Sequence, residues 1–525
     1  MVPSGRSLGV PSSYQPNKSQ PTPALGNYTD HSDGFYPAKQ TARGSDPAEH
    51  EEAQLLDEPI VLDHIEPSKP KKQKKPGKHR RLKKIFKRTA FATMILILAG
   101  AGYFGYKLYH TQKKVLAGGG KSVTVCSDDV DISQVKKEGD SRINILLLGI
   151  GGPGHDGANL TDTILLASID PITDKTSLIS IPRDLWVKIP GDGYQKINAA
   201  YANAVDASEA KTQVGQEQAG IEQLDKTLVP VLDGVKIHYH VLLDFSAFKQ
   251  TVDALGGITV NVPETLYDPT IAWENHYNST IAKKGVQTFN GDQALLYVRS
   301  RETSSDFARG ERQRLVIAAI KQKAFSAGTF SNPLKISSLL DTLGHNVYTD
   351  FSSGDIKCLY KQLATIPASA IGSLDMVTPP NNLLTTGNMN GLSVVEPRAG
   401  LFDYSDIHTF LHTSLKDGLI AKENAHVVVI NATDTAGLAT ASSAKLKEYG
   451  YNVTKADSTA TASNPATTTI VDLSKGTDKY TRNYLENRYG VAAVTKLPAD
   501  LGITVSPDTN FVIILGEDAA NTSQN

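Results

Sequence analysis

Five arginines lie within sixteen residues of this chain: Arg299, Arg301, Arg309, Arg312 and Arg314. Only three acidic residues accompany them, Glu302, Asp306 and Glu311. A guanidinium group stays protonated in proteins, and its forked donors match pairs of phosphate oxygens. Arg309 and Gln313 are four residues apart, so they share one face if the segment is helical. The pattern indicates either a clamp for a polyanion or an exposed basic face.

Two carboxylates precede the arginines in a second candidate site. Asp162 stands in Thr161-Asp162-Thr163, where a strand is predicted to begin, and Asp156 lies six residues earlier. Mg²⁺ takes oxygen ligands and is commonly held by one or two carboxylates together with a substrate phosphate. Asp162 and Asp156 therefore make a candidate magnesium site, with ordinary surface aspartates as the alternative.

Two further segments stand next to predicted strands. Arg183 follows a strand that ends in Ile181-Pro182, and strand ends in α/β sheets are where ligand groups gather; a local Arg183–Asp184 arrangement is the structural alternative. Residues 149–157 hold five glycines, which allow a backbone to approach an anion closely. No Gly-Lys-Ser/Thr follows and no Gly-x-Gly-x-x-Gly opens a helix, so nucleotide binding is not expected. A mobile surface loop is the alternative.

The elements that must position these residues begin behind a predicted membrane anchor. Residues 1–88 are rich in Pro, Ser and acids, and are predicted to be a disordered cytoplasmic segment. Their last part, 69–88, carries twelve Lys and Arg and no acid. It either fixes topology, which we favour, or binds anionic lipid. The uncharged run that follows predicts a transmembrane helix over 89–109, since eighteen helical residues span roughly 27 Å.

The basic flank predicts the orientation of this anchor. A signal peptide would need a shorter apolar core and would not follow 88 other residues, and a buried soluble helix would not need the polybasic flank. We therefore expect a single-pass protein of the cell membrane, with the N-terminus cytoplasmic and the C-terminal domains extracytoplasmic. Residues 110–139 are predicted to be a stalk. The only two cysteines, Cys126 and Cys358, could pair in an oxidising compartment, and they are too few for a cysteine-only metal site.

Two α/β domains are predicted beyond the stalk. In residues 140–402, apolar runs predict strands at 143–148, 162–169 and 176–181, and helices are predicted at 198–205, 216–227, 245–255 and 309–325. The expected fold is a layered αβα domain around a central mixed sheet. After a linker at 403–422, residues 423–525 predict a small α/β domain. Its strands are expected at 427–430, 451–454, 467–471 and 511–515, and its helices at 440–449 and 478–489.

A set of ordered motifs gives the chain a family resemblance. They are Leu146-Leu147-Leu148-Gly149, Asp162-Thr163-Ile164, Ser180-Ile181-Pro182-Arg183-Asp184, Lys196-Ile197-Asn198-Ala199-Ala200-Tyr201, Val252-Asp253-Ala254-Leu255-Gly256-Gly257-Ile258, the run from Gly291 to Arg301, and Arg309-Gly310-Glu311-Arg312-Gln313. The stretch from about Arg142 to Lys323 resembles the LytR-CpsA-Psr family of membrane-anchored cell-wall enzymes. Val427 to Thr433 and Ala436 to Ala439 resemble the LytR C-terminal domain.

The resemblance implies a phosphotransferase. Such enzymes move a glycopolymer from a polyisoprenyl pyrophosphate carrier to a hydroxyl of peptidoglycan through a phosphodiester. By resemblance, Asp162 would hold Mg²⁺, with Arg183, Arg301 and Arg309 as the catalytic cations beside it. Arg299, Arg312 and Gln313 are expected to bind the pyrophosphate-bearing substrate. An apolar groove would hold the lipid tail. The implied partners are the lipid-linked glycan, peptidoglycan and the membrane, and nucleic acid is not expected.

The chain departs from the family pattern in the glycine-rich loop. Many members carry an acid just after Leu-Gly-Val and an arginine shortly before Asp162, where this chain has Gly151 and Asn159-Leu160. Asp156 is the candidate to replace the carboxylate, and His155 stands beside it. The departure keeps a second hypothesis open, a non-catalytic cell-wall binding or attenuator protein. A third is a polyprenyl pyrophosphate hydrolase that uses the same clamp with water as acceptor.

Overall fold

The computed structural model describes residues 122, 130–300, 306–325, 346–377, 379–458 and 465–522. The cytoplasmic segment 1–88, the predicted transmembrane helix 89–109, Arg301 and Cys126 lie outside these ranges. Within the described ranges, none of the helices combines the length and the apolar character needed to cross a membrane. Cys358 is disulfide-bonded.

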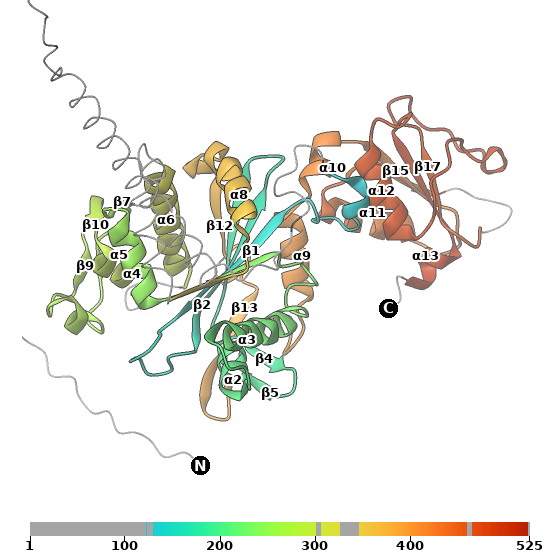
Figure 1. Ribbon diagram of the computed structural model, residues 1–525. Coiled ribbons are helices and arrows are strands. Elements are labelled where there is room, and N and C mark those ends of the chain that lie inside the picture. Colours follow the sequence, from blue (N-terminus) through green and yellow to red (C-terminus); the bar gives the residue numbers. More distant parts are fainter. Residues whose placement is uncertain are drawn as a thin grey trace, which may run out of the picture. The chain divides into compact units, whose positions relative to one another are not determined.

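A mixed six-stranded sheet forms the centre of the first unit (Figure 1). Its strand order is β11-β6-β1-β2-β3-β12, with β1/β6 and β3/β12 parallel and the other pairs antiparallel. The strands are β1 (Ile143–Ile150), β2 (Thr161–Asp170), β3 (Lys175–Ile181), β6 (Tyr239–Asp244), β11 (Val347–Thr349) and β12 (Ile371–Leu374). The predicted mixed sheet and its first three strands are confirmed.

Both faces of this sheet are buried. Successive apolar residues along its strands point to opposite faces, so each face presents an apolar surface. Leu146 and Leu148 of β1 pack into one core, and Ile143 and Ile145 pack into a second core on the other face. The first core also takes residues from α2 (Ala199–Ala207), α3 (Gln213–Leu228) and α9 (Ser405–Ser414). The second takes residues from α8 (Ser353–Thr365) and from α6 (Asp306–Phe325). Helices thus cover both faces, as strands with near-continuous apolar runs require.

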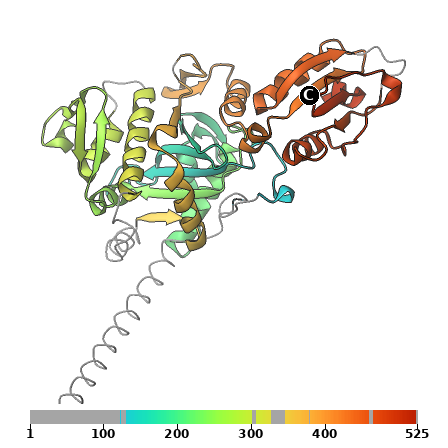
Figure 2. The ribbon, with the colours of Figure 1, turned by 90° about the horizontal axis from the view of Figure 1, so that it is seen from above.

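A third core lies on the other side of α6 from the sheet. It joins α6 to α4 (Phe245–Ala254), α5 (Gly291–Arg299) and the hairpin of β7 (Ile258–Val262) with β10 (Gly285–Phe289). Figures 1 and 2 show α6 between the sheet and this lobe. A Cβ at Gly291 would come within 2.3 Å of Lys249 O, so only glycine lets α5 begin this close to α4. The other short elements of the unit are β4 (Trp186–Ile189), β5 (Gly193–Lys196), β8 (Leu266–Tyr267), β9 (Thr280–Ala282), β13 (Leu384–Met389) and β14 (Leu392–Pro397).

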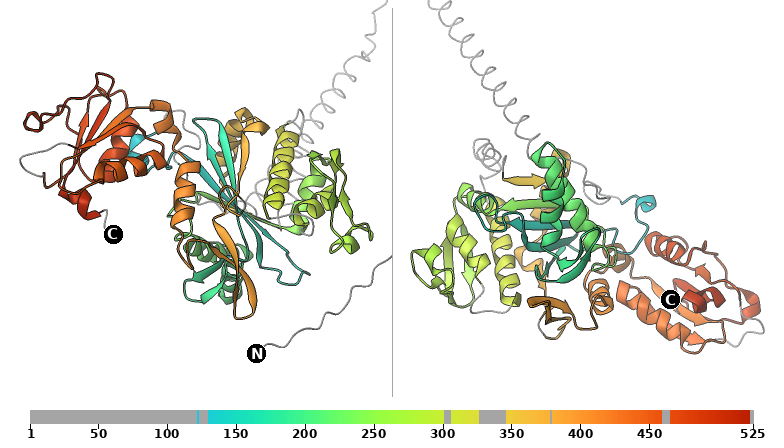
Figure 3. Two further views of the ribbon diagram at one scale, coloured as in Figure 1. Left: turned by 180° about the vertical axis from the view of Figure 1, so that it is seen from behind. Right: turned by 90° about the horizontal axis from the view of Figure 1, so that it is seen from below.

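The C-terminal unit is a four-stranded sheet in the order β16-β15-β18-β17, drawn in orange and red in Figure 3. Its strands are β15 (His426–Asn431), β16 (Asn452–Ser458), β17 (Thr469–Asp472) and β18 (Phe511–Leu515), and its main helices are α11 (Leu438–Tyr449) and α12 (Lys479–Tyr489). All six elements were predicted. The β15-α11-β16 pass joins parallel strands, whereas β17 runs antiparallel to β18.

Residues 130–139, predicted to be part of a stalk, pack instead on the C-terminal unit. Val130 and Val135 belong to its core. Glu138 accepts hydrogen bonds from Tyr451 Oη at 2.8 Å and from Arg488 Nε at 2.7 Å. The predicted linker 403–422 likewise contains α9 and most of α10 (Gly418–Glu423), whose apolar residues enter the first core and the C-terminal core respectively. Amphipathic segments of this kind are buried because their apolar side chains find a core to join.

Candidate functional site

An ion pair between Asp162 and Arg183 marks one edge of the central sheet. In the β2/β3 ladder Ile164 lies opposite Ile181. Continuing this antiparallel register by two residues brings Asp162 opposite Arg183, on the same face of the sheet. Arg183 Nη1 donates to Asp162 Oδ1 at 2.6 Å, and its Nε lies 3.5 Å from Asp184 Oδ2. Burial disfavours the charged guanidinium, but the two carboxylates offset it and raise the pKa of Arg183.

The glycine-rich loop leaves β1 at the same edge and closes on itself. Gly152 N donates to Ala158 O, and Leu160 N donates to Gly157 O. Gly152 has φ +80°, and a Cβ there would lie 2.8 Å from Cβ of Asp244. Glycine is therefore required for the loop to approach Asp244, which ends β6 directly beside Ile150 of β1.

One face of α6 changes from polar to apolar along the helix. Arg309 and Gln313 are followed on this face by Val316, Ile317 and Ile320, and all five line one cavity. Eleven residues of helix cover roughly 16 Å. Over about that length, the side chains of the cavity wall change from charged and polar to apolar.

The cavity beside α6, here called the α6 cavity, has a volume of about 470 Å³. Its polar lining comes from the sheet edge, the loop and two helices: His155, Asp156, Asp162, Arg183, Asp244, Arg299, Arg309 and Gln313. Its apolar lining includes Leu147, Leu165, Leu243, Phe248, Ile271 and Val298. The structure therefore brings together every predicted site residue within the described ranges except Arg312.

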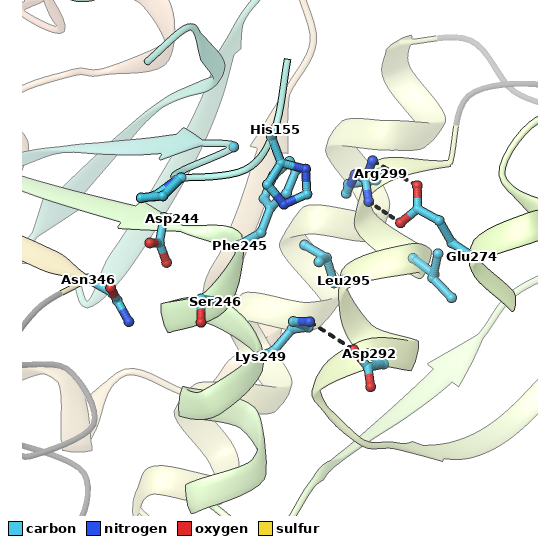
Figure 4. A pocket seen from close by; sticks show the side chains of 13 residues that line it. His155, Asp244, Phe245, Ser246, Lys249, Glu274, Asp292, Leu295, Arg299 and Asn346 are labelled. Atoms are coloured by element: carbon cyan, nitrogen blue, oxygen red, sulfur yellow. Dashed lines mark hydrogen bonds and ion pairs between the residues drawn. The ribbon is translucent and has the colours of Figure 1, made fainter. Parts of the chain in front are cut away.

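A second cavity, the α4 cavity, adjoins the first and is shown in Figure 4. Its volume is about 410 Å³ and its charged lining residues are Asp244, Lys249, Glu274, Asp292 and Arg299. His155, Phe245, Ser246 and Asn346 also line it. Six residues line both cavities: Gly151, His155, Asp244, Phe245, Leu295 and Arg299.

Arg299 stands at the boundary between the two cavities. Its Nη1 and Nη2 donate to the two carboxylate oxygens of Glu274 at 2.6 and 3.1 Å. The guanidinium carbon also lies 4.6 Å from the centre of the Phe245 ring, within the range of a cation–π contact. In this structure Arg299 therefore has its charge compensated by Glu274.

Arg312 and Arg314 do not line the α6 cavity. Arg312 is 5% exposed; its Nε donates to Tyr297 O at 2.9 Å and its Nη2 donates to Ser300 O. Arg314 pairs with Glu311 one turn away. Arg312 was predicted to bind substrate, but its side chain donates to backbone carbonyls at the C-terminal end of α5.

The residues around Asp162 offer a partial oxygen site. No group of three or more His, Cys, Asp or Glu side chains is placed to hold a metal in the parts of the chain that the structure describes. Asp156 and Asp162 both line the α6 cavity. Buried Gln313 Oε1, on the same wall, has no hydrogen-bond partner among the described residues. Two carboxylates and an amide oxygen fit a hydrated Mg²⁺ whose remaining ligands are water and phosphate, since its waters donate to such an oxygen.

Asp244 and Phe245 were missed from the sequence, although a signal was present. Asp244 caps α4 by accepting from Ala247 N at 2.6 Å. An Asp before a predicted helix and after an apolar run marks a strand end in an α/β sheet, where ligand groups collect. Only the helix was predicted there, so the carboxylate at its start was not considered.

Comparison with known proteins identifies the family. The model of the LytR_cpsA_psr family matches residues 103–399, and the model of the LytR cell envelope-related transcriptional attenuator matches residues 424–518. The first match covers more than half of the chain, which therefore belongs to the LytR-CpsA-Psr family.

Several named relatives are similar to this chain. A polyisoprenyl-teichoic acid–peptidoglycan teichoic acid transferase TagU of Oceanobacillus iheyensis is 36% identical over 45% of this chain and 66% of its own length. The TagU of Enterococcus faecalis is 32% identical over 52% of this chain and 82% of its own. A solved structure of the LytR-CPS2A-psr family protein YwtF (TagT), with bound octaprenyl pyrophosphate lipid, is 24% identical. It covers 57% of this chain and 98% of that one, with a TM-score of 0.39.

Proposed function

We propose that this protein is a membrane-anchored phosphotransferase that moves a glycopolymer from a polyisoprenyl pyrophosphate carrier to peptidoglycan through a phosphodiester. The observation that carries the proposal is the polarity of the α6 cavity, charged at Arg309 and apolar at Ile320. The names of the relatives, teichoic acid transferases that use a polyisoprenyl carrier and peptidoglycan, support the same reaction.

The graded cavity suits an amphiphile with an anionic head and a hydrocarbon tail. Arg183 and Arg309 supply cations at the head end, while Val316, Ile317 and Ile320 supply apolar surface further along. Burial of such surface is worth about 25 cal/mol per Å². A nucleotide or a free sugar phosphate would leave the apolar half unmatched. A prenyl pyrophosphate fills both halves.

In the proposed reaction the arginines neutralise charge on the pyrophosphate. Phosphoryl transfer depends on positioning and on stabilising charge at the phosphate oxygens more than on covalent participation of the protein. Arg183 and Arg309 would grip the two phosphates, and Gln313 would donate its amide NH₂ or accept from a bound water. Arg299 would join them by exchanging Glu274 for phosphate.

We further propose Mg²⁺ as the cofactor, held by Asp162 with Asp156 as the second carboxylate. Bound there, Mg²⁺ would neutralise phosphate charge and orient the pyrophosphate. Asp162 is half-buried beside Arg183, and Asp156 is exposed on the glycine-rich loop. The loop's glycines give it the backbone freedom to bring Asp156 over the phosphates.

The membrane is part of this proposal. The uncharged run at 89–106 behind the basic block at 69–88 supports a single anchor over 89–109 with the N-terminus in the cytoplasm. An anchored enzyme stays near a carrier that is confined to the bilayer, and the α/β units would then lie outside the cell.

One experiment separates the three functions considered for this chain. The full-length protein in detergent is incubated with Mg²⁺ and a polyprenyl-pyrophosphate-linked glycan, with and without peptidoglycan oligomers. A transferase makes a glycan–peptidoglycan product only when the acceptor is present. A hydrolase releases glycan phosphate in both cases, and a binding or attenuator protein retains the lipid without turnover. Either of the last two results would reject the proposed function.

A further inference from the structure

The α4 cavity differs from the α6 cavity in chemistry. The α6 cavity continues into the apolar surface of α6, whereas the α4 cavity is walled by charged and polar side chains from α4, α5 and the glycine-rich loop (Figure 4). Its volume of about 410 Å³ falls in the range of small-molecule sites. A hydrocarbon chain would gain little there.

The cations of the α4 cavity are already paired with carboxylates. Lys249 Nζ lies 3.2 Å from Asp292 Oδ1, and Arg299 forms its two bonds to Glu274. Two cations stand against three carboxylates when Asp244 is included, a formal balance of −1. Such a wall repels a second pyrophosphate. It presents many donors and acceptors to a neutral ligand rich in hydroxyl groups.

Asp244 is the carboxylate common to both cavities. It is 7% exposed, and the backbone N–H of Ala247 holds its Oδ1 in place. Burial raises the pKa of Asp244, which makes it a stronger base than an exposed aspartate. Close by, the rings of His155 and Phe245 meet edge to face at 5.2 Å, and Arg299 covers Phe245. These three side chains form a partition between the two cavities, with Asp244 beside it.

His155 also occupies space near the position where many family members carry an acid. A Cβ at Gly151 would lie 3.0 Å from Cβ of His155. A carboxylate side chain at 151 would therefore need His155 to move, so the Gly151 departure and the His155 position go together. The carboxylate that the structure places beside this loop is Asp244, under Gly152.

We propose that the α4 cavity is the acceptor subsite, which binds a sugar of the peptidoglycan chain, and that Asp244 removes the proton from its attacking hydroxyl. This inference rests on the proposed transferase function. The hydroxyl oxygen forms a bond to the phosphorus that carries the glycan, and the bond from that phosphorus to the bridging oxygen breaks. The hydroxyl proton passes to the Asp244 carboxylate, and the prenyl monophosphate leaves with the electron pair of the broken bond.

Asp244→Asn and Asp244→Ser test the base. Both residues are good helix N-caps, so α4 keeps its start, but neither accepts a proton at neutral pH. In the full-length protein, transfer to peptidoglycan oligomers should fall at least about a hundredfold, the usual contribution of a general base. Binding of octaprenyl pyrophosphate should not weaken, because both variants remove a negative charge from the lining of the α6 cavity. Transfer at the wild-type rate by either folded variant, or an equal loss of lipid binding, would overturn the assignment.

Lys249→Met tests the subsite independently of Asp244. The variant should fold, because an ion pair at a half-exposed position contributes little to stability. The KM for the peptidoglycan oligomer should rise about tenfold, the value of one charge-assisted hydrogen bond, with lipid binding unchanged. The matched control is Lys445→Met, a lysine in a similar ion pair with Glu448 on α11 of the C-terminal unit, which should leave the KM unchanged. An unchanged KM in Lys249→Met, or the same rise in both variants, would refute the acceptor subsite.

The proposed function and the acceptor subsite can be rejected separately. If the wild-type protein makes no glycan–peptidoglycan product, the proposed function itself is wrong. If the wild type transfers normally and the Asp244 and Lys249 variants do so as well, only the acceptor subsite is wrong.

Discussion

The two α/β units of this chain use their charged side chains in different ways. In the first unit, Asp162, Arg183 and Arg309 meet on the wall of a cavity at one edge of the sheet. In the C-terminal unit, Arg488 bonds Glu138, and Arg482 pairs with Glu486 and with nearly buried Asp472. The first arrangement presents charge to a cavity. The second satisfies charge within the protein.

The difference shows how the same residue type acquires two roles. An ion pair that joins segments far apart in sequence, such as Glu138 with Arg488, fixes residues 130–139 on the C-terminal unit. A guanidinium that shares a cavity with apolar side chains and another cation gains most from an incoming anion. We therefore expect substitutions in the first set to change transfer, and substitutions in the second set to change stability.

The largest effect is expected from Arg309→Ala. Loss of two charge-assisted bonds to the pyrophosphate, each about 1.5–3 kcal/mol, should slow transfer by roughly a hundredfold or more. The loss of transfer should be much larger than any loss in the free energy of unfolding, because Arg309 lies on the cavity wall. The matched arginine is Arg482, on α12. Arg482→Ala should transfer within twofold of the wild type, and equal losses in the two variants would erase the distinction between the units.

Asp162→Asn should lose Mg²⁺ dependence and at least about tenfold in rate, because an amide keeps the shape but not the charge that a hard cation requires. Transfer is measured across a Mg²⁺ titration, with Asp184→Asn as the comparison, since Asp184 bonds Lys196 at 2.7 Å and does not line the α6 cavity. A wild-type enzyme that is equally active with and without chelator would remove the metal from the proposal.

Arg312→Met sharpens the comparison inside a single helix. Two backbone acceptors, Tyr297 O and Ser300 O, lose their buried donors at about 1–3 kcal/mol each. The free energy of unfolding should fall by about 2–4 kcal/mol in denaturant titrations, while lipid binding by the folded protein persists. Arg314→Met, whose partner Glu311 is one turn away, should cost under about 1 kcal/mol. A folded Arg312→Met variant of normal stability that failed to bind lipid would restore Arg312 to the substrate site.

The smallest effect concerns a buried charge of the first unit that lies outside both cavities. His240 Nδ1 lies 2.8 Å from Asp350 Oδ2, and Nε2 lies 3.1 Å from Asp225. Burial opposes the charged ring, but these two carboxylates prevail and raise the pKa of His240 to about 9. Since the unfolded pKa is about 6.5, the stabilisation is complete below pH 6.5 and is lost as the pH rises through 9.

The free energy of unfolding should therefore fall by about 1–3 kcal/mol between pH 6.5 and pH 9. In His240→Gln that slope should disappear. Denaturant titrations at four or five pH values measure it, and an identical slope in the two proteins would assign the pH dependence to other groups.

The part of the regular structure that depends on strong local patterns was predicted. The apolar runs at 143–148, 162–169 and 176–181 became β1, β2 and β3, and all six elements of the C-terminal unit were predicted. In the first unit, strands β4 to β14 and helices α5, α8 and α9 were not predicted. The shortest of them, such as β8 and β9, have only two or three residues, which carry too little periodicity. The packing of residues 130–139 was missed for a different reason. Their partners lie about 280 to 350 positions later in the sequence.

The candidate site was predictable in composition and not in arrangement. Sequence alone named Asp162, Arg183, Arg309 and Gln313, because the motifs of the family mark them and because forked cations with carboxylates suit a pyrophosphate. Strand register then explains why Asp162 meets Arg183. No local pattern distinguishes Arg309 from Arg312, which are three residues apart on one helix.

Tertiary packing determines which of Arg309 and Arg312 faces the cavity. The helical repeat fixes the angle between Arg309 and Arg312, but the rotation of α6 is set by Ile317 and Ala318 in one core and by Val316 and Ala319 in another. That rotation turns Arg309 to the cavity and Arg312 to the C-terminal end of α5. In the same way, β6 had to lie beside β1 before Asp244 could reach the glycine-rich loop. The sequence by itself determined which groups were available, and packing between distant segments decided which of them face the α6 cavity.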